Sequence, residues 1–471
     1  MHLLKKKNYL DISLYTFFMM LPISIAAGNF FLNFNIFLIL SFFLSFVIIN
    51  KIKVDKTYLI FILLFFIYSI INSVLINFSL TALWKSIAYL RYLFLPLAIS
   101  IFFQLTKINK KYLFLFYISF VMFLSFDIFY QYIFYEDIFG FDPGMCADEN
   151  RPLKLCVRFS GFFGEELIGG SFISLFGPLS VFLYLSGGEL NNKKVIISTL
   201  CLLIMFFAIL ISGERSGLLY FLLFNFVFFY FLIFKILKNK KKFLILIFVI
   251  PFFIIFLMTK FSSTVNQRLV NYPMYLLTKA ECGMSFEKTT IKKIKTCFKG
   301  LNYKDIIKNS LDTSWGHHYL SAYEIFKSNP IFGTGIKSFR HECKNYDFKF
   351  LEDKYKFISS FHTKSVCSTH PHNYHVQIFA EMGLFGYIFF AVFILYLLKK
   401  GFYNFNLKNH STSENLLIYA SLSAIIAFIF PLKPTGDFFS TSFGFWFWFI
   451  LGIYLYSFKN NHHGVRKAYN L

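Results

Sequence analysis

The chain has 471 residues, of which 57% are hydrophobic, 22% are aromatic and only 15% are charged, and its formal net charge is +23. Soluble domains carry about 25% charged and roughly 45–50% apolar residues, so this composition excludes an ordinary soluble globular protein. The apolar residues form many continuous blocks long enough to cross a bilayer as helices. A transmembrane β-barrel would need alternating segments instead. The sequence therefore predicts an all-α polytopic membrane protein.

We expect about twelve membrane-spanning helices, each ending where an apolar block meets polar residues. In chain order, they are predicted at 10–27, 30–49, 57–77, 83–104, 112–133, 166–186, 194–212, 216–235, 243–259, 372–398, 415–430 and 440–458. The first block is followed by many more spans and has no convincing cleavage site, so we interpret it as a helix rather than a removed signal peptide.

Lysine clusters fall on alternate connections between these blocks and predict the topology. They lie around Lys5, Lys51, Lys107, Lys193, Lys235 to Lys242 and Lys399, and in the tail after Lys459. Because Lys and Arg are enriched in cytoplasmic loops, we assign the positive charge to topology rather than to nucleic acid, and we place both termini in the cytoplasm.

The opposite side of the membrane then carries two loops. Residues 1–259 hold nine helices with a short outer loop near 134–165, residues 260–371 form a large outer loop, and residues 372–471 hold three helices and a cytoplasmic tail. The large loop is rich in lysine, but long loops cross regardless of charge. Within it, 319–328 has the apolar spacing of a helix that stops at Asn329-Pro330.

Six of the seven cysteines fall in the two outer loops, which suggests disulfides in an oxidising compartment. The simplest connectivity joins sequence neighbours, although six cysteines allow fifteen connectivities. These neighbouring pairs are Cys146 with Cys156, Cys282 with Cys297, and Cys343 with Cys367.

A histidine-rich run, His370-Pro371-His372-Asn373-Tyr374-His375, leads into the tenth predicted helix. Pro371 suits the start of a helix, so His372 is expected at the outer interface with His375 one turn further on. Histidine has an ordinary pKa of about 6.5, which suits proton transfer near neutral pH. A single interfacial histidine is more often structural, but several beside Asn and Gln favour a site.

A second polar run, Ser212-Gly213-Glu214-Arg215-Ser216-Gly217, forms a tight outer turn between two apolar helices. The planar guanidinium of Arg215 suits bidentate binding of phosphate. The alternative is an anchoring role in which Arg215 snorkels or pairs with Glu214.

Weaker candidates lie in the outer loops and near the spans. They are Arg158, Glu165, Glu166, Arg268, His317, His318, Lys337 and Arg340 in loops, and Lys85, Arg91 and Asp127 in or near spans. The sequence contains no P-loop, no Rossmann glycine fingerprint and no metal-ligand spacing of the HExxH or CxxC type.

Three motifs together resemble the O-antigen ligase superfamily, which also includes O-antigen polymerases and some protein O-oligosaccharyltransferases. They are Arg-x-x-x-Leu from Arg215 to Leu219, Pro-x-x-Gly-x-Gly from Pro330 to Gly335, and the histidine run followed by Glu-x-Gly-x-x-Gly from Glu381 to Gly386. The resemblance covers about residues 155–400. It implies a GT-C-like, inverting, metal-independent glycosyltransferase without a cofactor, in the bacterial inner membrane with its site facing the periplasm.

The resemblance also implies roles for individual residues. His372 would be the catalytic residue near the acceptor hydroxyl, and Arg215 would bind the pyrophosphate of an undecaprenyl-pyrophosphate-linked glycan. A second arginine is expected shortly before the helix that stops at Pro330, where histidines stand instead, so Arg268, His317 and His318 all remain candidates for that contact. The supporting residues would be His370, Asn373, His375, Glu381 and Arg340.

The chemistry agrees with the resemblance, because a pyrophosphate leaving group without a metal needs fixed cationic donors and a sugar hydroxyl needs a base. The acceptor would be lipid A core or another glycan, which leaves ligase and polymerase both open, with membrane lipids as the remaining partners. A transporter or flippase is an alternative from a different class, although such proteins tend to place polar sites at the midplane of repeated halves. A non-catalytic membrane scaffold is a third alternative.

Overall fold

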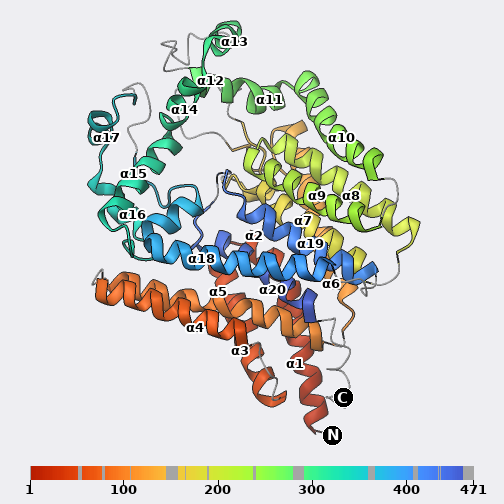
Figure 1. Ribbon diagram of the computed structural model, residues 1–471. Coiled ribbons are helices and arrows are strands. Elements are labelled where there is room, and N and C mark those ends of the chain that lie inside the picture. Colours follow the sequence, from red (N-terminus) through yellow and green to blue (C-terminus); the bar gives the residue numbers. More distant parts are fainter. Residues whose placement is uncertain are drawn as a thin grey trace.

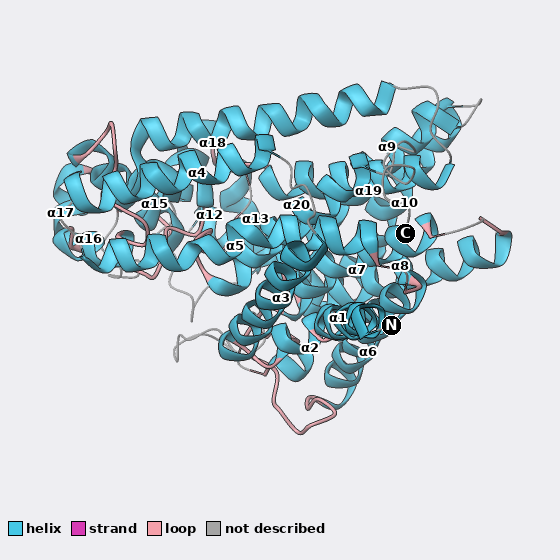
Figure 2. Ribbon diagram, turned by 90° about the horizontal axis from the view of Figure 1, so that it is seen from below, coloured by secondary structure: helices cyan, strands magenta, loops and turns pink. Residues whose placement is uncertain are grey.

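A computed structural model describes most of the chain. The described residues are 2–50, 56–76, 80–106, 108–144, 157–164, 166–187, 190–236, 240–278, 291–358, 366–406, 412–432, 434 and 436–459. Within these ranges the regular structure is helical, and Figure 2 shows helices joined by loops without a strand. The predicted all-α fold is therefore confirmed.

The helices follow one another closely along the chain. The first half contains α1 (His2–Met19), α2 (Leu21–Ala26), α3 (Asn29–Asn50), α4 (Lys56–Ile71), η1 (Asn72–Ile76), α5 (Leu80–Leu105), α6 (Lys110–Phe134), η3 (Gly161–Phe163), α7 (Gly169–Ser186), α8 (Asn192–Ser212), α9 (Arg215–Ile236) and α10 (Lys240–Phe261). The second half contains α11 (Ser263–Asn266), η4 (Gln267–Asn271), α12 (Tyr272–Thr278), α13 (Ile291–Gly300), α14 (Tyr303–Leu311), α15 (Ser314–Ser328), α16 (Phe339–Glu342), η6 (Cys343–Asn345), α17 (Phe348–Lys354), α18 (Tyr374–Asn406), α19 (Thr412–Ile429) and α20 (Thr441–Lys459).

Nine helices of the described residues are long and apolar enough to cross a membrane, or ten if Val249–Phe261 and Ser263–Thr278, bent by 111°, form one span. The expected count of twelve is therefore not confirmed. The predicted span 10–27 is divided between α1 and α2, where Pro22 lies in the first turn of α2. The predicted span 415–430 corresponds to α19, whose apolar part, Ser413–Ile429, is shorter than the other spans.

The core lies where α19 and α20 pack against α5, α7 and α9. Side chains on every face of α19 are buried, including Ile418, Leu422 and Ile425, as expected for a helix that is apolar all round and surrounded by others. In contrast, α3, α8 and α10 expose apolar side chains such as Phe37 and Ile196. Such surfaces are unusual on a soluble protein but suit contact with lipid tails.

A glycine contact connects the large loop to α18. Gly383 interrupts α18 with φ 64°, and Gly333 in the Pro-x-x-Gly-x-Gly loop has φ 73°. A Cβ on Gly333 would lie 2.4 Å from the Gly383 nitrogen, and one on Gly383 would lie 2.5 Å from the Gly333 nitrogen. The backbone of Gly335 donates to the carbonyl of Glu381 at 2.8 Å. Both glycines are therefore needed because the two backbones touch.

The large loop between α10 and α18 is itself helical. Figure 1 shows α12 to α17 forming an outlying layer on the side of the molecule away from the lower end of α1. The predicted helix 319–328 begins earlier, at Ser314, because the Thr313 hydroxyl caps it by accepting from Gly316 N–H. It stops at Ser328, before Pro330, as predicted.

Two of the three charged residues singled out in or near the spans, Asp127 and Arg91, are hydrogen-bonded within the fold. The carboxylate of Asp127 accepts from the backbone N–H groups of Ile138 and Phe162, at 2.9 and 2.6 Å. Arg91 donates to the side-chain oxygen of Asn33 at 3.1 Å. These hydrogen bonds give Asp127 and Arg91 structural roles within the fold.

Candidate active site

Arginines from three separate segments converge beside the start of α9. Arg215 is the first residue of α9, and its guanidinium carbon lies 5.4 Å from the ring centre of Tyr272 and 5.8 Å from that of Trp315. Arg268, from η4, lies 5.5 Å from the same Tyr272 ring. Arg158 is close enough to interact electrostatically with both other arginines. The three like charges would repel one another, so their convergence favours an anion between them.

Arg268 is fixed by the turn that precedes α9. It is only 1% exposed, and its Nη2 donates to the carbonyl oxygen of Gly213 at 3.3 Å. Gly213 has φ 73°, and a Cβ there would lie 3.3 Å from Arg268. The buried Nε of Arg158 makes no hydrogen bond within the described residues. Buried donors are normally satisfied, so Arg158 has a donor available for a ligand.

Glu214 does not neutralise Arg215. Its carboxylate accepts from Gly170 N–H at 2.8 Å, and from the backbone N–H and hydroxyl of Ser171 at 3.0 and 2.5 Å. Glu214 therefore caps the N-terminal end of α7, where the helix dipole favours negative charge. No carboxylate of the described residues forms an ion pair with Arg215. The Arg215–Glu214 pairing considered from the sequence is absent from this part of the chain.

Three histidines gather next to the arginines. The ring of His372 lies 4.3 Å from that of His370 and 5.4 Å from that of His318, centre to centre. Trp315 joins the two groups, because its ring lies 6.3 Å from the ring of His372 and 5.8 Å from the guanidinium carbon of Arg215. Among the described residues no hydrogen bond reaches the His372 ring, so both of its nitrogens are available to a substrate.

His372 stands outside the helix that the sequence predicted from residue 372. The helix α18 begins at Tyr374, because the Asn373 side chain accepts from the backbone N–H of His375 at 2.9 Å and so acts as the N-cap. His372 itself has φ 55°, a left-handed conformation that is uncommon for residues other than glycine and is often retained at functional sites.

Burial lowers the pKa of His372 to about 3, and the neighbouring His370 and His318 add to this effect. Burial likewise lowers the pKa of His318. Both rings are therefore neutral at physiological pH, and a neutral imidazole can accept a proton. Positive charge beside Trp315 comes from the arginines rather than from these histidines.

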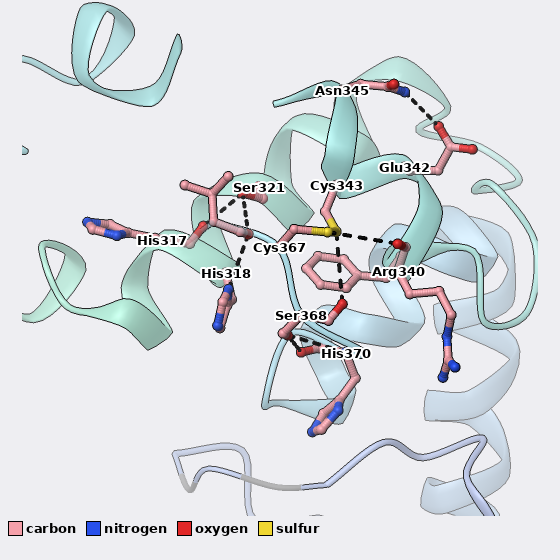
Figure 3. Close-up of a disulfide and its surroundings, with 12 residues drawn as sticks. His317, His318, Ser321, Arg340, Glu342, Cys343, Asn345, Cys367, Ser368 and His370 are labelled. Atoms are coloured by element: carbon pink, nitrogen blue, oxygen red, sulfur yellow. Dashed lines mark hydrogen bonds between the residues drawn. A yellow bond between two sulfur atoms is a disulfide. The ribbon is translucent and has the colours of Figure 1, made fainter. Parts of the chain in front are cut away.

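The adjacent histidines of α15 have different surroundings. His318 Nδ1 lies 3.2 Å from the carbonyl oxygen of Val366, and its ring faces His372. His317 is fully buried, its Nε2 lies 3.3 Å from an Asp312 carboxylate oxygen, and its ring packs on Phe348. Figure 3 shows the two side chains pointing in different directions. Successive helical residues diverge by about 100°, so only His318 joins the histidine group.

A disulfide holds the segment that precedes His372. Cys343 and Cys367 are joined with a Cα–Cα distance of 5.2 Å, and Figure 3 shows Ser368 and His370 directly after this bond. Cys297 is also disulfide-bonded, but its predicted partner Cys282 lies outside the described residues, as do Cys146, Cys156 and Glu165. The crosslink therefore restrains the chain segment that leads from the large loop to His372.

The remaining polar residues of the histidine motif hold helices together. The Asn373 amide donates to the carbonyl of Pro431 at 2.8 Å. His375 bonds through Nδ1 to the Tyr387 hydroxyl at 3.2 Å and through Nε2 to the carbonyl of Ile429 at 2.9 Å. The structure thus gives Asn373 and His375 positioning roles at the start of α18.

Glu381 and Arg340 belong to a buried hydrogen-bond network that lies one to two turns further along α18. The Glu381 carboxylate accepts from Lys337 N–H at 2.9 Å and Phe339 N–H at 3.2 Å. Asp437 accepts from Gln377 at 2.6 Å and pairs with Arg340 at 3.4 Å. This network fixes the loop after Gly335 against α18, and it does not contact His372.

The structure thus brings together Arg215 and Arg268, and then His372, His370 and His318, with Trp315 between the two groups. It separates His317, His375, Glu381 and Arg340 from them. Sequence reasoning treated Arg158 as minor and did not single out Tyr272 or Trp315, because aromatic residues are too common in this chain to stand out. A cationic residue beside an aromatic ring is visible only in three dimensions.

The fold and this polar site define a polytopic, all-α membrane protein with a concentrated cationic and imidazole site. The family model described as O-antigen ligase matches residues 200–391. This range contains Arg215, Arg268, His318 and His372. A comparison with curated proteins finds no match.

The family match confirms the resemblance inferred from the motifs, because residues 200–391 are similar to the O-antigen ligase family. This match supports a membrane glycosyltransferase-like enzyme. It does not by itself distinguish a ligase from a polymerase.

Proposed function

We propose that the protein is an inverting, metal-independent glycosyltransferase that moves a glycan from undecaprenyl pyrophosphate to a hydroxyl of lipid A core or a similar acceptor. The observation that carries the proposal is the convergence of Arg158, Arg215 and Arg268 beside His372, with Trp315 in contact with both groups. Fixed donors of this kind stabilise the negative charge that develops on a departing pyrophosphate.

In the proposed step, the acceptor oxygen attacks the anomeric carbon while its proton passes to His372. The bond between the anomeric carbon and the pyrophosphate oxygen breaks, and the pyrophosphate leaves with the electron pair. Because attack and departure occur on opposite faces, the anomeric configuration inverts. A base with a pKa of about 3 is weak, but the negative charge of a bound pyrophosphate would raise the pKa of His372 and make it a stronger base.

The alternative within the family is a polymerase, for which the acceptor is a second lipid-linked glycan. Proteoliposomes that contain the purified enzyme and lipid-linked donor, with either lipid A core or a second lipid-linked glycan, separate the two. We expect transfer to lipid A core with an inverted linkage. Transfer only between lipid-linked glycans would replace ligase by polymerase, and no transfer to either acceptor would contradict the proposal.

We further propose that this site faces the periplasm of a bacterial inner membrane, with both termini cytoplasmic. The alternating lysines and the outer-loop cysteines support this orientation. Lys304 is exposed on α14, so a Lys304→Cys variant without the native outer-loop cysteines should react with a membrane-impermeant thiol reagent in intact spheroplasts. Reaction only after lysis would invert the orientation.

A further inference from the structure

A cavity of about 170 Å³ lies apart from the arginines and histidines of the candidate active site. The first turns of α5 form one wall with Lys85, and the loop after Gly335 forms the other with Lys337 and Ser338. Pockets for drug-sized ligands usually measure roughly 300–1,000 Å³. This cavity therefore fits one small group and not a glycan chain.

The cavity is cationic. No carboxylate of the described residues forms an ion pair with Lys85 or Lys337. Glu342 also lines the cavity, and its carboxylate accepts from Asn345 at 3.3 Å. Burial and then the charges of Arg340 and Lys85 lower the pKa of Lys337, opposed by Asp437 and Glu381. An anion in the cavity would relieve this repulsion.

The loop holds Lys337 in place at a conformational cost. Lys337 has φ 62°, a conformation that residues other than Gly, Asn and Asp seldom adopt. Its backbone N–H donates to the buried Glu381 carboxylate at 2.9 Å. A strained lysine that the surrounding structure keeps in place is characteristic of a ligand site.

The surroundings of Lys85 place the cavity at a membrane interface. Trp84 and Leu80 on the same end of α5 are 64% and 68% exposed, and tryptophan gathers at the level of lipid headgroups. The loop that forms one wall of the cavity is bonded to α18, because the backbone N–H of Lys337 donates to Glu381 of that helix at 2.9 Å. Figure 3 shows Arg340 and His318 on opposite sides of the disulfide.

We propose that Lys85 and Lys337 bind a phosphate group of the acceptor lipid, in a cavity that none of the three arginines lines. This inference rests on the proposed function, because it assumes a second lipid substrate whose hydroxyl reaches His372. The two phosphate-bearing lipids would then occupy separate cationic sites.

The first test measures binding without catalysis. The wild type, a Lys85→Gln/Lys337→Asn double variant and a Lys349→Gln control are placed in phosphatidylcholine nanodiscs containing phosphatidic acid, and bound lipid is measured by native mass spectrometry. Asparagine tolerates the positive φ at 337, and Lys349 is an exposed lysine outside the cavity. Because charge-assisted hydrogen bonds are lost, we expect about tenfold less bound phosphatidic acid in the double variant only. Equal binding in all three proteins would overturn the proposal.

The second test measures transfer in proteoliposomes with acceptor that carries or lacks its phosphate. We expect the double variant to raise the apparent KM for phosphorylated acceptor about tenfold and to leave the donor KM unchanged. For phosphate-free acceptor, the wild type and the double variant should have the same apparent KM. An unchanged acceptor KM despite weaker phosphatidic acid binding would mean that the cavity holds a phospholipid headgroup, which contradicts the acceptor assignment. If the wild type transfers nothing, the proposed function fails while the binding test still decides the phosphate site.

Discussion

Two histidines of one motif, His372 and His375, have opposite surroundings. His372 has a left-handed backbone, and its ring lies beside the rings of Trp315, His318 and His370. His375, three residues later, is bonded at both ring nitrogens to Tyr387 and Ile429. A side chain whose hydrogen bonds are all made within the fold contributes to architecture, whereas one held in a strained position with both nitrogens available is prepared for a ligand. We therefore propose a chemical role for the first histidine and a packing role for the second.

The sharpest way to break this comparison is to replace each histidine with asparagine. In His372→Asn we expect transfer to fall by about 10²–10⁴-fold, the usual contribution of a general base. The melting temperature should stay the same, since no hydrogen bond of the described residues is lost and asparagine tolerates positive φ.

The matched variant His375→Asn should behave in the opposite way. It should lose about 1–3 kcal/mol of stability, because it leaves buried groups unsatisfied, while each folded molecule keeps its turnover. Transfer by purified enzyme and melting temperature are measured on both variants. A large loss of turnover per folded molecule in His375→Asn would erase the distinction.

Arg215→Lys tests the cationic side of the same site. It keeps the charge and loses the planar fork, so we expect transfer to fall about 10²–10³-fold, as when one preorganised donor is removed. Arg91→Lys is the matched control, since Arg91 bonds to Asn33 within the helices and should affect stability alone. Equal losses of transfer in the two variants would remove Arg215 from the site.

Features that neighbouring residues determine could be predicted from the sequence, whereas features that depend on contacts between distant segments could not. The helices could be predicted because membrane spans are long apolar blocks, and Pro330 stops α15 locally. The break at Gly383 depends on packing against the backbone of Gly333 in another segment. The convergence of Arg158, Arg215 and Arg268 could not be predicted, because three distant segments meet only in the folded chain.

Removing the disulfide should loosen the segment before His372. The crosslink closes a loop with a sequence separation of 24, and by the loop-entropy relation its loss in a Cys343→Ser/Cys367→Ser variant should cost about 3 kcal/mol. We expect a lower melting temperature and faster proteolysis of the large loop. If neither changes, the crosslink does not restrain this approach to His372.

The pH dependence of stability gives the smallest expected effect. The pKa of His372 is about 3 in the folded protein and about 6.5 when unfolded, so the unfolded chain binds more protons between these values. The stabilisation from neutral His372 is complete above pH 6.5 and is lost as the pH falls toward 3. Melting temperatures from pH 7.5 to 4.5 should therefore fall more steeply for the wild type than for His372→Asn. Parallel curves would contradict the burial of a neutral His372.

We propose that the arginines bind the lipid pyrophosphate and that His372 acts afterwards on the acceptor. The most direct measurement is the affinity of undecaprenyl pyrophosphate for the wild type, an Arg158→Gln/Arg215→Gln/Arg268→Gln variant and His372→Asn, all in nanodiscs. The account predicts that the arginine variant loses binding by at least about tenfold, since charge-assisted hydrogen bonds are removed, and that His372→Asn binds like the wild type. Retained binding in the arginine variant, or lost binding in His372→Asn, would contradict it.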